Sequence, residues 1–239
     1  MHINVHAGHN PAGMTASGAS GLIEESTENR KVKNEVIRQL RELGNTVYDC
    51  TVDNGKGQMD VLKKIVEKCN AHEADLDVSI HFNSAANDMS GDGRTTGTEV
   101  YVYSASSSAV LPAERVCSEI AALGYRNRGV KYSRDLYILK NTKAPAMLIE
   151  CCFVDDRDDV RLYSPEKMAS AIVRGIAGKR PGDTEGTEEA EAGKEITEAG
   201  GTEKQIYCVQ TGAYAVKANA EAMRDKLVKA GFEAVIVKK

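Results

Sequence analysis

The sequence predicts an α/β fold with a twisted, mostly parallel sheet flanked by helices, plus a short C-terminal β-α-β segment. The first observation behind this prediction is that strand-like and helix-like segments alternate along residues 1–178. This order is typical of parallel sheets that carry helices on both faces. The second observation is the apolar run APAMLIECCF (144–153), which is typical of a strand inside a buried sheet.

The elements are expected in the following order. A short strand covers HINVHAG (2–8), and a long helix covers residues 25–44, because apolar residues recur there at helical spacing up to Gly44. Next come a strand at 45–52, a helix at 59–73, and two strands at 77–83 and 97–104. A helix at 109–124, the strand at 144–153 and a last helix at 164–178 complete this part of the chain.

Composition divides the chain into a domain at 1–178, a linker at 179–203 and a short tail at 204–239. Eight of the 35 acidic residues lie in residues 181–203, but only one of the 31 Lys and Arg residues does. This stretch nearly lacks large apolar side chains, so it cannot bury enough surface to offset chain entropy. We therefore expect an acidic, flexible linker.

Composition also disfavours several classes of protein. No apolar run reaches 18 residues, so we expect no membrane insertion. The N-terminus lacks a basic leader and an apolar signal segment, so we expect synthesis in the cytoplasm without a signal peptide. The six cysteines lie at irregular spacing without a C-x-x-C pair, which disfavours a cysteine zinc site or a disulfide framework. Nucleic acid is not expected as a partner, because the chain has no basic patch.

Four polar side chains lie where an α/β sheet could bring them to one rim. His9 follows the first strand, Glu25 begins the first long helix, His81 lies near the end of a central strand, and Glu150 ends the run AMLIE. Two histidines and a carboxylate can hold zinc and leave a fourth position for water. A further carboxylate can take the proton of that water and pass it to a leaving amine.

The residues alone leave a structural explanation open for each of these side chains. His81 could be a satisfied ring at the end of a buried strand, and His9 could be a turn residue. Glu25 could simply be a favourable charge at the positive end of a helix dipole. Glu150 could be a charge at a strand exit, although a glutamate that ends so apolar a strand must be paired, protonated or functional.

Four motifs occur in a characteristic order: VHAGHN, a glutamate at the start of the first helix, SIHFN, and LYILKNTKAPAMLIECCF. In these motifs residues 1–178 resemble the zinc-dependent N-acetylmuramoyl-L-alanine amidases of the amidase_3 family, which include phage endolysins. The resemblance implies a zinc amidase domain that hydrolyses the amide between the lactyl group of N-acetylmuramic acid and the L-alanine of the stem peptide. Peptidoglycan is then the expected partner.

The resemblance also implies residue roles. His9, Glu25 and His81 would hold Zn²⁺, and Glu150 would act as general base and then as general acid. The opening differs from the usual Asp-Pro-Gly-His-Gly-Gly of the family and places His6 near the site as an alternative histidine.

Glu25 is preferred over Glu24 because of the residues that follow it. In the family the ligand is typically followed by Asn four residues later and by an aliphatic residue seven later. Asn29 and Val32 meet this pattern when counted from Glu25.

Two further residues are expected at the substrate site. Asn83 follows His81 by two positions and is expected to brace the loop there. Arg94 lies in the polar, glycine-rich loop 84–97 and is expected to meet a peptide carboxylate. This loop is a candidate substrate rim, and an exposed connection without function is the alternative.

The tail resembles the SPOR peptidoglycan-binding repeat through Val-Gln-x-Gly-Ala-Tyr at 209–214 and Ala-Gly-Phe-Glu-Ala at 230–234. It covers one β-α-β half of a module that normally has two, and 36 residues form only a small core. The alternatives are pairing with a second copy of the chain as a homodimer, or a remnant that does little. A folded tail would bind glycan strands and raise the local substrate concentration through the linker.

Other functions remain open at this point. The same residues suit a zinc peptidase that acts on wall peptides, and a non-catalytic peptidoglycan-binding protein is a third reading. Serine catalysis through Ser79 and His81 is disfavoured, because no nucleophile elbow or third member is evident. We expect a phage or prophage endolysin that reaches the cell wall after release, with a bacterial enzyme of a lysing mother cell as the rival.

Overall fold

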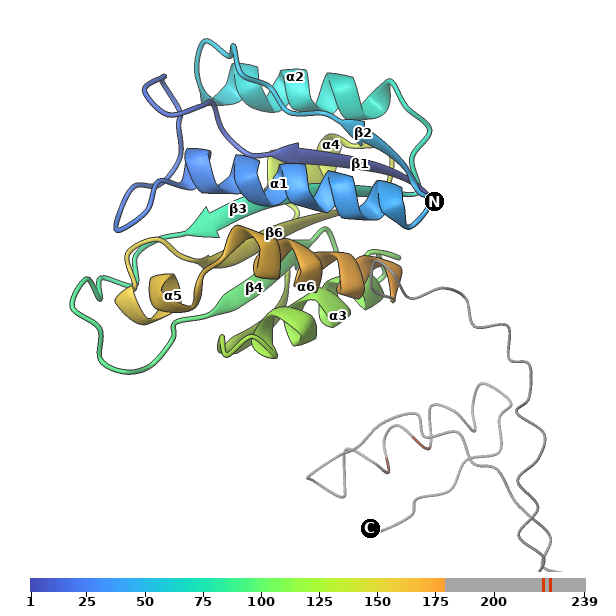
Figure 1. Cartoon of the computed structure of the whole chain (residues 1–239). Helices are drawn as coiled ribbons and strands as arrows, with labels where there is room; N and C mark the ends of the chain where they lie inside the picture. Colours follow the sequence, from blue (N-terminus) through green and yellow to red (C-terminus); the bar gives the residue numbers. More distant parts are fainter. Residues whose placement is uncertain (179–220, 222–223, 225–239) are drawn as a thin grey trace, which may run out of the picture. The chain divides into compact units, whose positions relative to one another are not determined.

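A computed structural model describes residues 1–178, 221 and 224 (Figure 1). The expected linker at 179–203 and the β-α-β tail lie outside the described residues, apart from these two positions. The fold below is therefore that of residues 1–178.

The centre of the fold is one six-stranded sheet with the order β2-β1-β3-β6-β4-β5. Its strands are β1 (His2–Ala7), β2 (Thr46–Asp49), β3 (Leu76–Asn83), β4 (Thr98–Val102), β5 (Asn127–Tyr132) and β6 (Ala146–Phe153). Neighbouring strands are parallel except for β4 and β6, which pair antiparallel. The predicted α/β fold with a mostly parallel sheet is confirmed.

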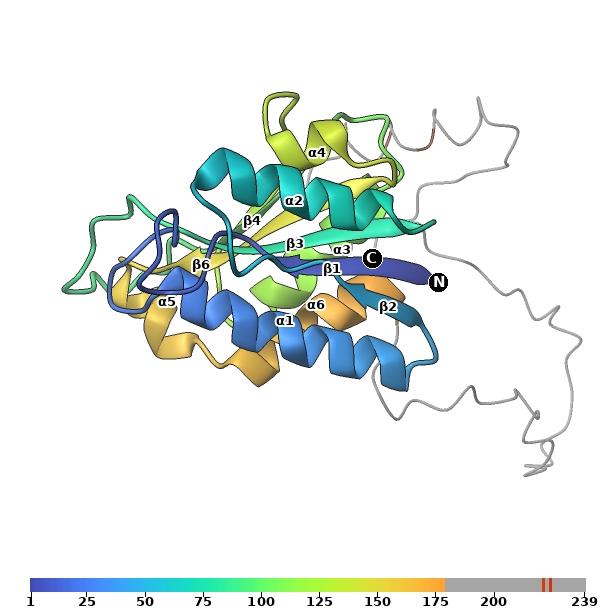
Figure 2. The ribbon, with the colours of Figure 1, turned by 90° about the horizontal axis from the view of Figure 1, so that it is seen from above.

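Helices cover both faces of this sheet (Figure 2). Their bounds are α1 (Glu25–Glu42), α2 (Gln58–Asn70), α3 (Val110–Ala121), α4 (Tyr137–Asn141), α5 (Arg157–Leu162) and α6 (Pro165–Ala177). The apolar faces of α1, α3 and α6 pack on one side of the sheet in the larger core. On the other side, α2 and α4 share a smaller core. Within residues 1–178, no helix has both the length and the apolar character of a membrane span.

Three short elements were not expected from the sequence. The strand β5 is an edge strand that pairs only with β4, and its residues NRGVKY are exposed or half-buried. An edge strand of this kind needs no apolar alternation, so periodicity does not reveal it. Helices α4 and α5 have five and six residues, which is too short to display a helical period.

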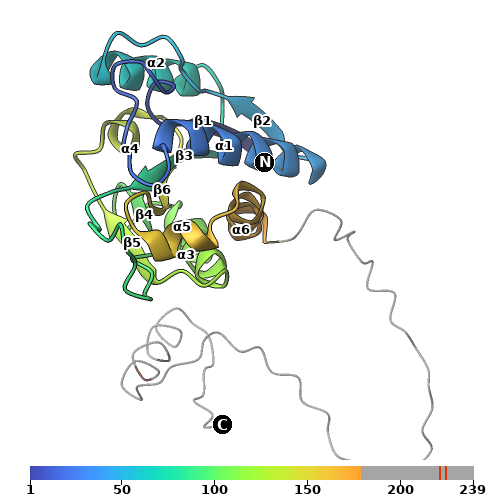
Figure 3. The same ribbon diagram turned by 60° about the vertical axis from the view of Figure 1, so that its left-hand side comes forward.

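The direction of each strand determines which residues share an edge of the sheet. Strands β1, β3 and β6 are parallel, so their carboxyl ends lie at one edge. Because β4 runs antiparallel to β6 and β5 follows β4, the amino ends of β4 and β5 lie at the same edge. Figure 3 turns this edge toward the reader.

Candidate active site

Two histidines and a glutamate meet at this edge of the sheet. His9 follows β1, Glu25 is the first residue of α1, and His81 lies near the end of β3. The Oε1 atom of Glu25 lies 3.0 Å from Nδ1 of His81 and 3.4 Å from Nε2 of His9. One candidate ligand atom from each residue lies within 4.8 Å of the other two, so the three could hold one metal ion.

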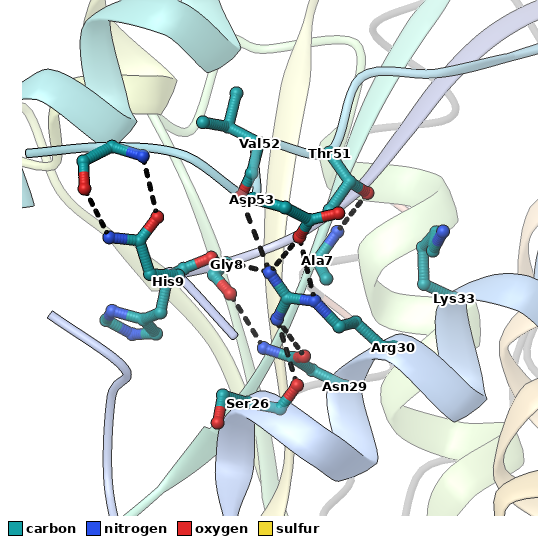
Figure 4. Close-up of polar contacts among 12 residues, drawn as sticks. Ala7, Gly8, His9, Ser26, Asn29, Arg30, Lys33, Thr51, Val52 and Asp53 are labelled. Carbon is teal, nitrogen blue, oxygen red and sulfur yellow. Dashed lines mark hydrogen bonds and ion pairs between the residues drawn. The ribbon is translucent and has the colours of Figure 1, made fainter. Parts of the chain in front are cut away.

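Helix α1 also fixes the backbone that carries His9. His9 has a left-handed backbone with φ of 65°, which is uncommon for a residue other than glycine. The Asn29 amide donates to the carbonyl of Gly8 at 2.8 Å, and the Arg30 guanidinium donates to the carbonyl of His9 at 3.0 Å (Figure 4). Arg30 is held in turn by Asp53 at 2.6 Å. The first turns of α1 therefore supply one candidate ligand, Glu25, and hold the loop that carries a second candidate ligand, His9.

The protonation states of this cluster suit a metal site. Burial opposes ionisation of Glu25, but hydrogen bonds from His81 and His9 outweigh it and hold the pKa of Glu25 well below its usual value. The backbone amides of Phe82 and Ala19 also donate to this carboxylate. Burial lowers the pKa of His81, which favours a neutral ring. Metal ions bind neutral imidazoles and ionised carboxylates.

Glu150 lies beside this cluster. It pairs in register with His81 of β3 and, across the antiparallel contact, with Glu99 of β4. Its Oε2 atom is buried and has no hydrogen-bond partner within the described part of the chain. Burial, followed by the charges of Glu25 and Glu99, raises the pKa of Glu150 to about 8. An unpartnered buried carboxylate oxygen indicates a position where a ligand or a water binds.

The structure adds a network next to Glu150 that the sequence did not indicate. The buried carboxylate of Glu99 accepts hydrogen bonds from Asn83 Nδ2 at 3.0 Å, Tyr101 Oη at 2.9 Å and Arg128 Nε at 2.8 Å. Glu99 and Arg128 lie at the amino ends of β4 and β5, whereas polar residues that follow the carboxyl ends of strands are the ones that a sequence marks as candidates. A charged residue directly before the apolar positions of TEVYV was the available signal.

Of the two residues expected at the substrate site, Asn83 lies in this network and Arg94 does not. Arg94 is exposed, and among the described residues only its backbone has a hydrogen bond, to Asp92. The loop 84–97 that carries Arg94 is nevertheless anchored. Carboxylates at the end of β6 and the start of α5 accept its backbone N–H groups, and they belong to Asp155, Asp156, Asp158 and Asp159.

His6 is fully buried on β1 and is separate from the candidate ligands. Its Nδ1 atom lies 3.5 Å from the hydroxyl of Ser79. Ser79 therefore pairs with His6 and not with His81, which further disfavours serine catalysis by Ser79 and His81.

The edge of this α/β sheet gathers two histidines and a buried glutamate that could hold a metal ion, and a second glutamate whose Oε2 atom has no hydrogen-bond partner within residues 1–178. Hydrolases that use a metal ion to activate water need such a set of residues. The chain belongs to the N-acetylmuramoyl-L-alanine amidase family, whose model matches residues 3–178. Residues 203–239 match the SPOR domain model.

Three curated relatives match between 66% and 75% of the chain. An uncharacterized protein of Clostridium perfringens is 35% identical over 186 residues, which cover 75% of this chain and 52% of the relative. The sporulation-specific N-acetylmuramoyl-L-alanine amidase of Bacillus subtilis is 29% identical, over 70% of this chain and 58% of its own length. The endolysin of Bacillus phage SPP1 is 26% identical, over 66% of this chain and 59% of its own length. The chain thus spans about half the length of the first of these relatives.

Solved structures share the fold. The catalytic domain of the CD27L endolysin, which targets Clostridia difficile, superposes with a TM-score of 0.67 at 27% identity and covers 75% of this chain and 98% of that domain. The amidase AmiC2 of Nostoc punctiforme gives a TM-score of 0.61 at 29% identity, and the match covers 74% of this chain and 96% of that structure.

Proposed function

We propose that this protein is a zinc-dependent N-acetylmuramoyl-L-alanine amidase that cleaves the amide between N-acetylmuramic acid and L-alanine in peptidoglycan. The observation that carries the proposal is the buried Oε2 atom of Glu150, which has no hydrogen-bond partner among residues 1–178 and lies beside His9, Glu25 and His81. The membership of the chain in this family supports the choice of bond.

The residues present fit a catalytic zinc ion. Two neutral imidazoles and one ionised carboxylate are a ligand set that catalytic zinc uses, with a further position for water or substrate. When bound there, zinc would polarise the substrate carbonyl and lower the pKa of a water molecule. Binding is assigned to His9, Glu25 and His81, whose donor atoms already converge.

Glu150 is assigned the proton transfers. Its carboxylate takes a proton from the attacking water and then delivers it to the nitrogen of the leaving L-alanine. A carboxyl with a pKa of about 8 holds a proton more readily than an exposed glutamate does. A nearby positive charge favours the ionised form, so this pKa falls toward neutrality once a divalent cation is bound. Both protonation states are then accessible near neutral pH.

Replacing Gly8 by alanine is expected to weaken zinc binding by about 10-fold or more, because the ligand geometry would be disturbed. A Cβ atom at Gly8 would lie 2.0 Å from Cε1 of His81, so the imidazole ring must move. Competition with a chromophoric chelator measures the affinity. Gly13→Ala is the control for backbone strain without a clash, because its φ is +84° while a Cβ there meets nothing within 4 Å, and it should keep the zinc affinity. Equal zinc affinity of Gly8→Ala and wild type would contradict the assignment of His81.

The biological setting is a proposal of the same kind. We propose that the protein acts on the cell wall after release from the cytoplasm, as a phage or prophage endolysin. Similarity to the phage SPP1 endolysin and to the CD27L endolysin domain supports this. A role in a lysing mother cell is the second candidate, and similarity to the sporulation-specific amidase of Bacillus subtilis favours it. The SPOR match supports peptidoglycan as a binding partner, and a homodimer through the tail stays a prediction.

Digestion of purified peptidoglycan with the full chain tests the proposed function. Newly freed amino termini are labelled after treatment with untreated protein, chelated protein, and chelated protein with zinc restored. We expect new N-terminal alanine that disappears on chelation and returns with zinc. Freed termini of other residues would indicate a peptidase. No release from several wall types by folded, zinc-loaded protein would favour a binding protein without catalysis.

A further inference from the structure

A row of four charged or titratable side chains crosses the sheet at the active-site edge. We call it the polar row: His81 on β3, Glu150 on β6, Glu99 on β4 and Arg128 on β5. His81 pairs with Glu150, and Glu150 pairs with Glu99. The register between β4 and β5 shifts between Thr98 and Val100, and Arg128 lies opposite this irregularity. Adjacent strands are about 4.8 Å apart, so the row spans about 14 Å.

Arg128 is held in place at the end of the polar row. Its Nε atom donates to Glu99 at 2.8 Å, and its guanidinium carbon lies 5.1 Å from the ring centre of Phe153. Glu99 is fixed in turn by Asn83 and Tyr101, and its side chain is only 5% exposed. A substrate group would therefore meet a guanidinium whose position is already set.

The contacts of Arg128 leave part of its guanidinium unused. Only Nε is engaged with Glu99, and neither Nη1 nor Nη2 has a partner among residues 1–178. The side chain is 30% exposed, so a solute can reach it. A guanidinium with free terminal nitrogens suits a carboxylate, because its planar N–H groups match two carboxylate oxygens.

The charges around the site determine where an anionic group of a substrate can bind. Glu25, Glu150 and Glu99 place three carboxyl groups near the reacting position. An anionic group of a substrate is repelled by these carboxylates and attracted where Arg128 lies. Lys131, on the same strand, adds to the positive potential, since its charge acts on Glu99 as that of Arg128 does.

The role of Glu150 indicates which side of the substrate meets Arg128. Glu150 must reach the leaving nitrogen, and a peptide that runs from that nitrogen along the polar row passes Glu150 toward β4 and β5. The acyl side then remains near His81. Two extended residues span about 7 Å, and Glu150 and Arg128 are two strand spacings apart, about 10 Å. The Arg128 side chain can cover the remaining distance.

We propose that Arg128 binds a carboxylate on the stem-peptide residue that follows L-alanine and thereby selects a free carboxylate over a carboxamide at that position. This inference rests on the proposed function. It makes Arg128 a specificity-determining residue, with Glu99 as the residue that positions it.

Two synthetic substrates test the inference with the full, zinc-loaded chain. One is N-acetylmuramoyl-L-alanyl-D-glutamate with a free α-carboxylate and a blocked side-chain carboxyl, and the other carries an α-carboxamide instead. We expect wild type to favour the carboxylate by about 10- to 100-fold in kcat/KM, mainly through KM, because hydrogen bonds to charged groups are strong. Arg128→Met is expected to lose this preference. Arg134→Ala, an exposed arginine beyond the far end of β5, is the control that should keep it.

A second variant guards against misfolding of the first. Arg128→Met leaves the buried Glu99 without its ion-pair partner, so Glu99→Gln combined with Arg128→Met is measured in parallel and should also show no preference. Equal rates on both substrates with wild type, or an equal loss on both with these variants, would overturn the inference and leave the amidase intact. Wild type that releases alanine from peptidoglycan but cleaves neither substrate would overturn the inference alone. Wild type that cleaves none of the three would overturn the proposed function as well.

Discussion

Glu150→Gln is expected to reduce release of N-terminal alanine from peptidoglycan by about 10²- to 10⁴-fold, the range that a general acid–base contributes. Glutamine keeps the size of the side chain but can neither take nor deliver the proton. Because Oε2 of Glu150 has no partner within the described chain, the substitution breaks no hydrogen bond of that atom. Zinc content should therefore stay the same. The measurement is the initial rate of amino-terminal labelling at saturating zinc.

The same variant has a stability signature in the metal-free protein. Because the pKa of Glu150 is raised from 4.5 to about 8, the folded state keeps a proton that the unfolded state releases between these values. The contribution of Glu150 to the free energy of unfolding therefore falls as the pH rises from about 4.5 to about 8. Glu150→Gln should lack this decrease, and denaturant unfolding at several pH values would show the difference.

A matched control shows whether the effects are specific to position 150 or follow from any Glu→Gln substitution. Glu114→Gln makes the same chemical change on the exposed face of α3 and should preserve the rate and the pH dependence. An active Glu150→Gln protein with normal zinc content would rule out Glu150 as the proton carrier.

Glu25→Gln is expected to abolish tight zinc binding, with a loss of more than about 100-fold in affinity and a corresponding loss of activity. It removes a charged ligand, and second-sphere changes alone cost 10- to 100-fold. It also disturbs the site, because the Glu25 carboxylate accepts from the backbone amides of Phe82 and Ala19. A glutamine NH₂ group cannot accept from either of them.

Thermal unfolding with and without zinc measures this effect independently of activity. A ligand at 100 times its dissociation constant stabilises a protein by about 2.7 kcal/mol, and this stabilisation should be absent in Glu25→Gln. Glu67→Gln on the exposed face of α2 is the control that should retain it. Stabilisation by zinc that persists in Glu25→Gln would remove Glu25 from the ligand set.

Much of the architecture could be predicted from local patterns. Apolar residues at helical spacing located α1, α2, α3 and α6, and the apolar run around Met147 located the central strand β6. Strand β5 was missed because an edge strand with Gly129 needs no apolar alternation. The choice of Glu25 over Glu24 rested on the residues that follow it, and the structure places Glu25 against both histidines while Glu24 is exposed.

By itself, the sequence determined the fold class and the candidate set His9, Glu25, His81 and Glu150, because helix and strand periodicity and the chemistry of polar residues at strand ends are local properties. Only the tertiary structure decided that Glu99 and Arg128 join Glu150 at the same edge. Their place depends on β4 running antiparallel to β6, and strand direction follows from how the whole sheet pairs its backbone. The direction in which a five-residue strand such as TEVYV pairs cannot be predicted from its own residues.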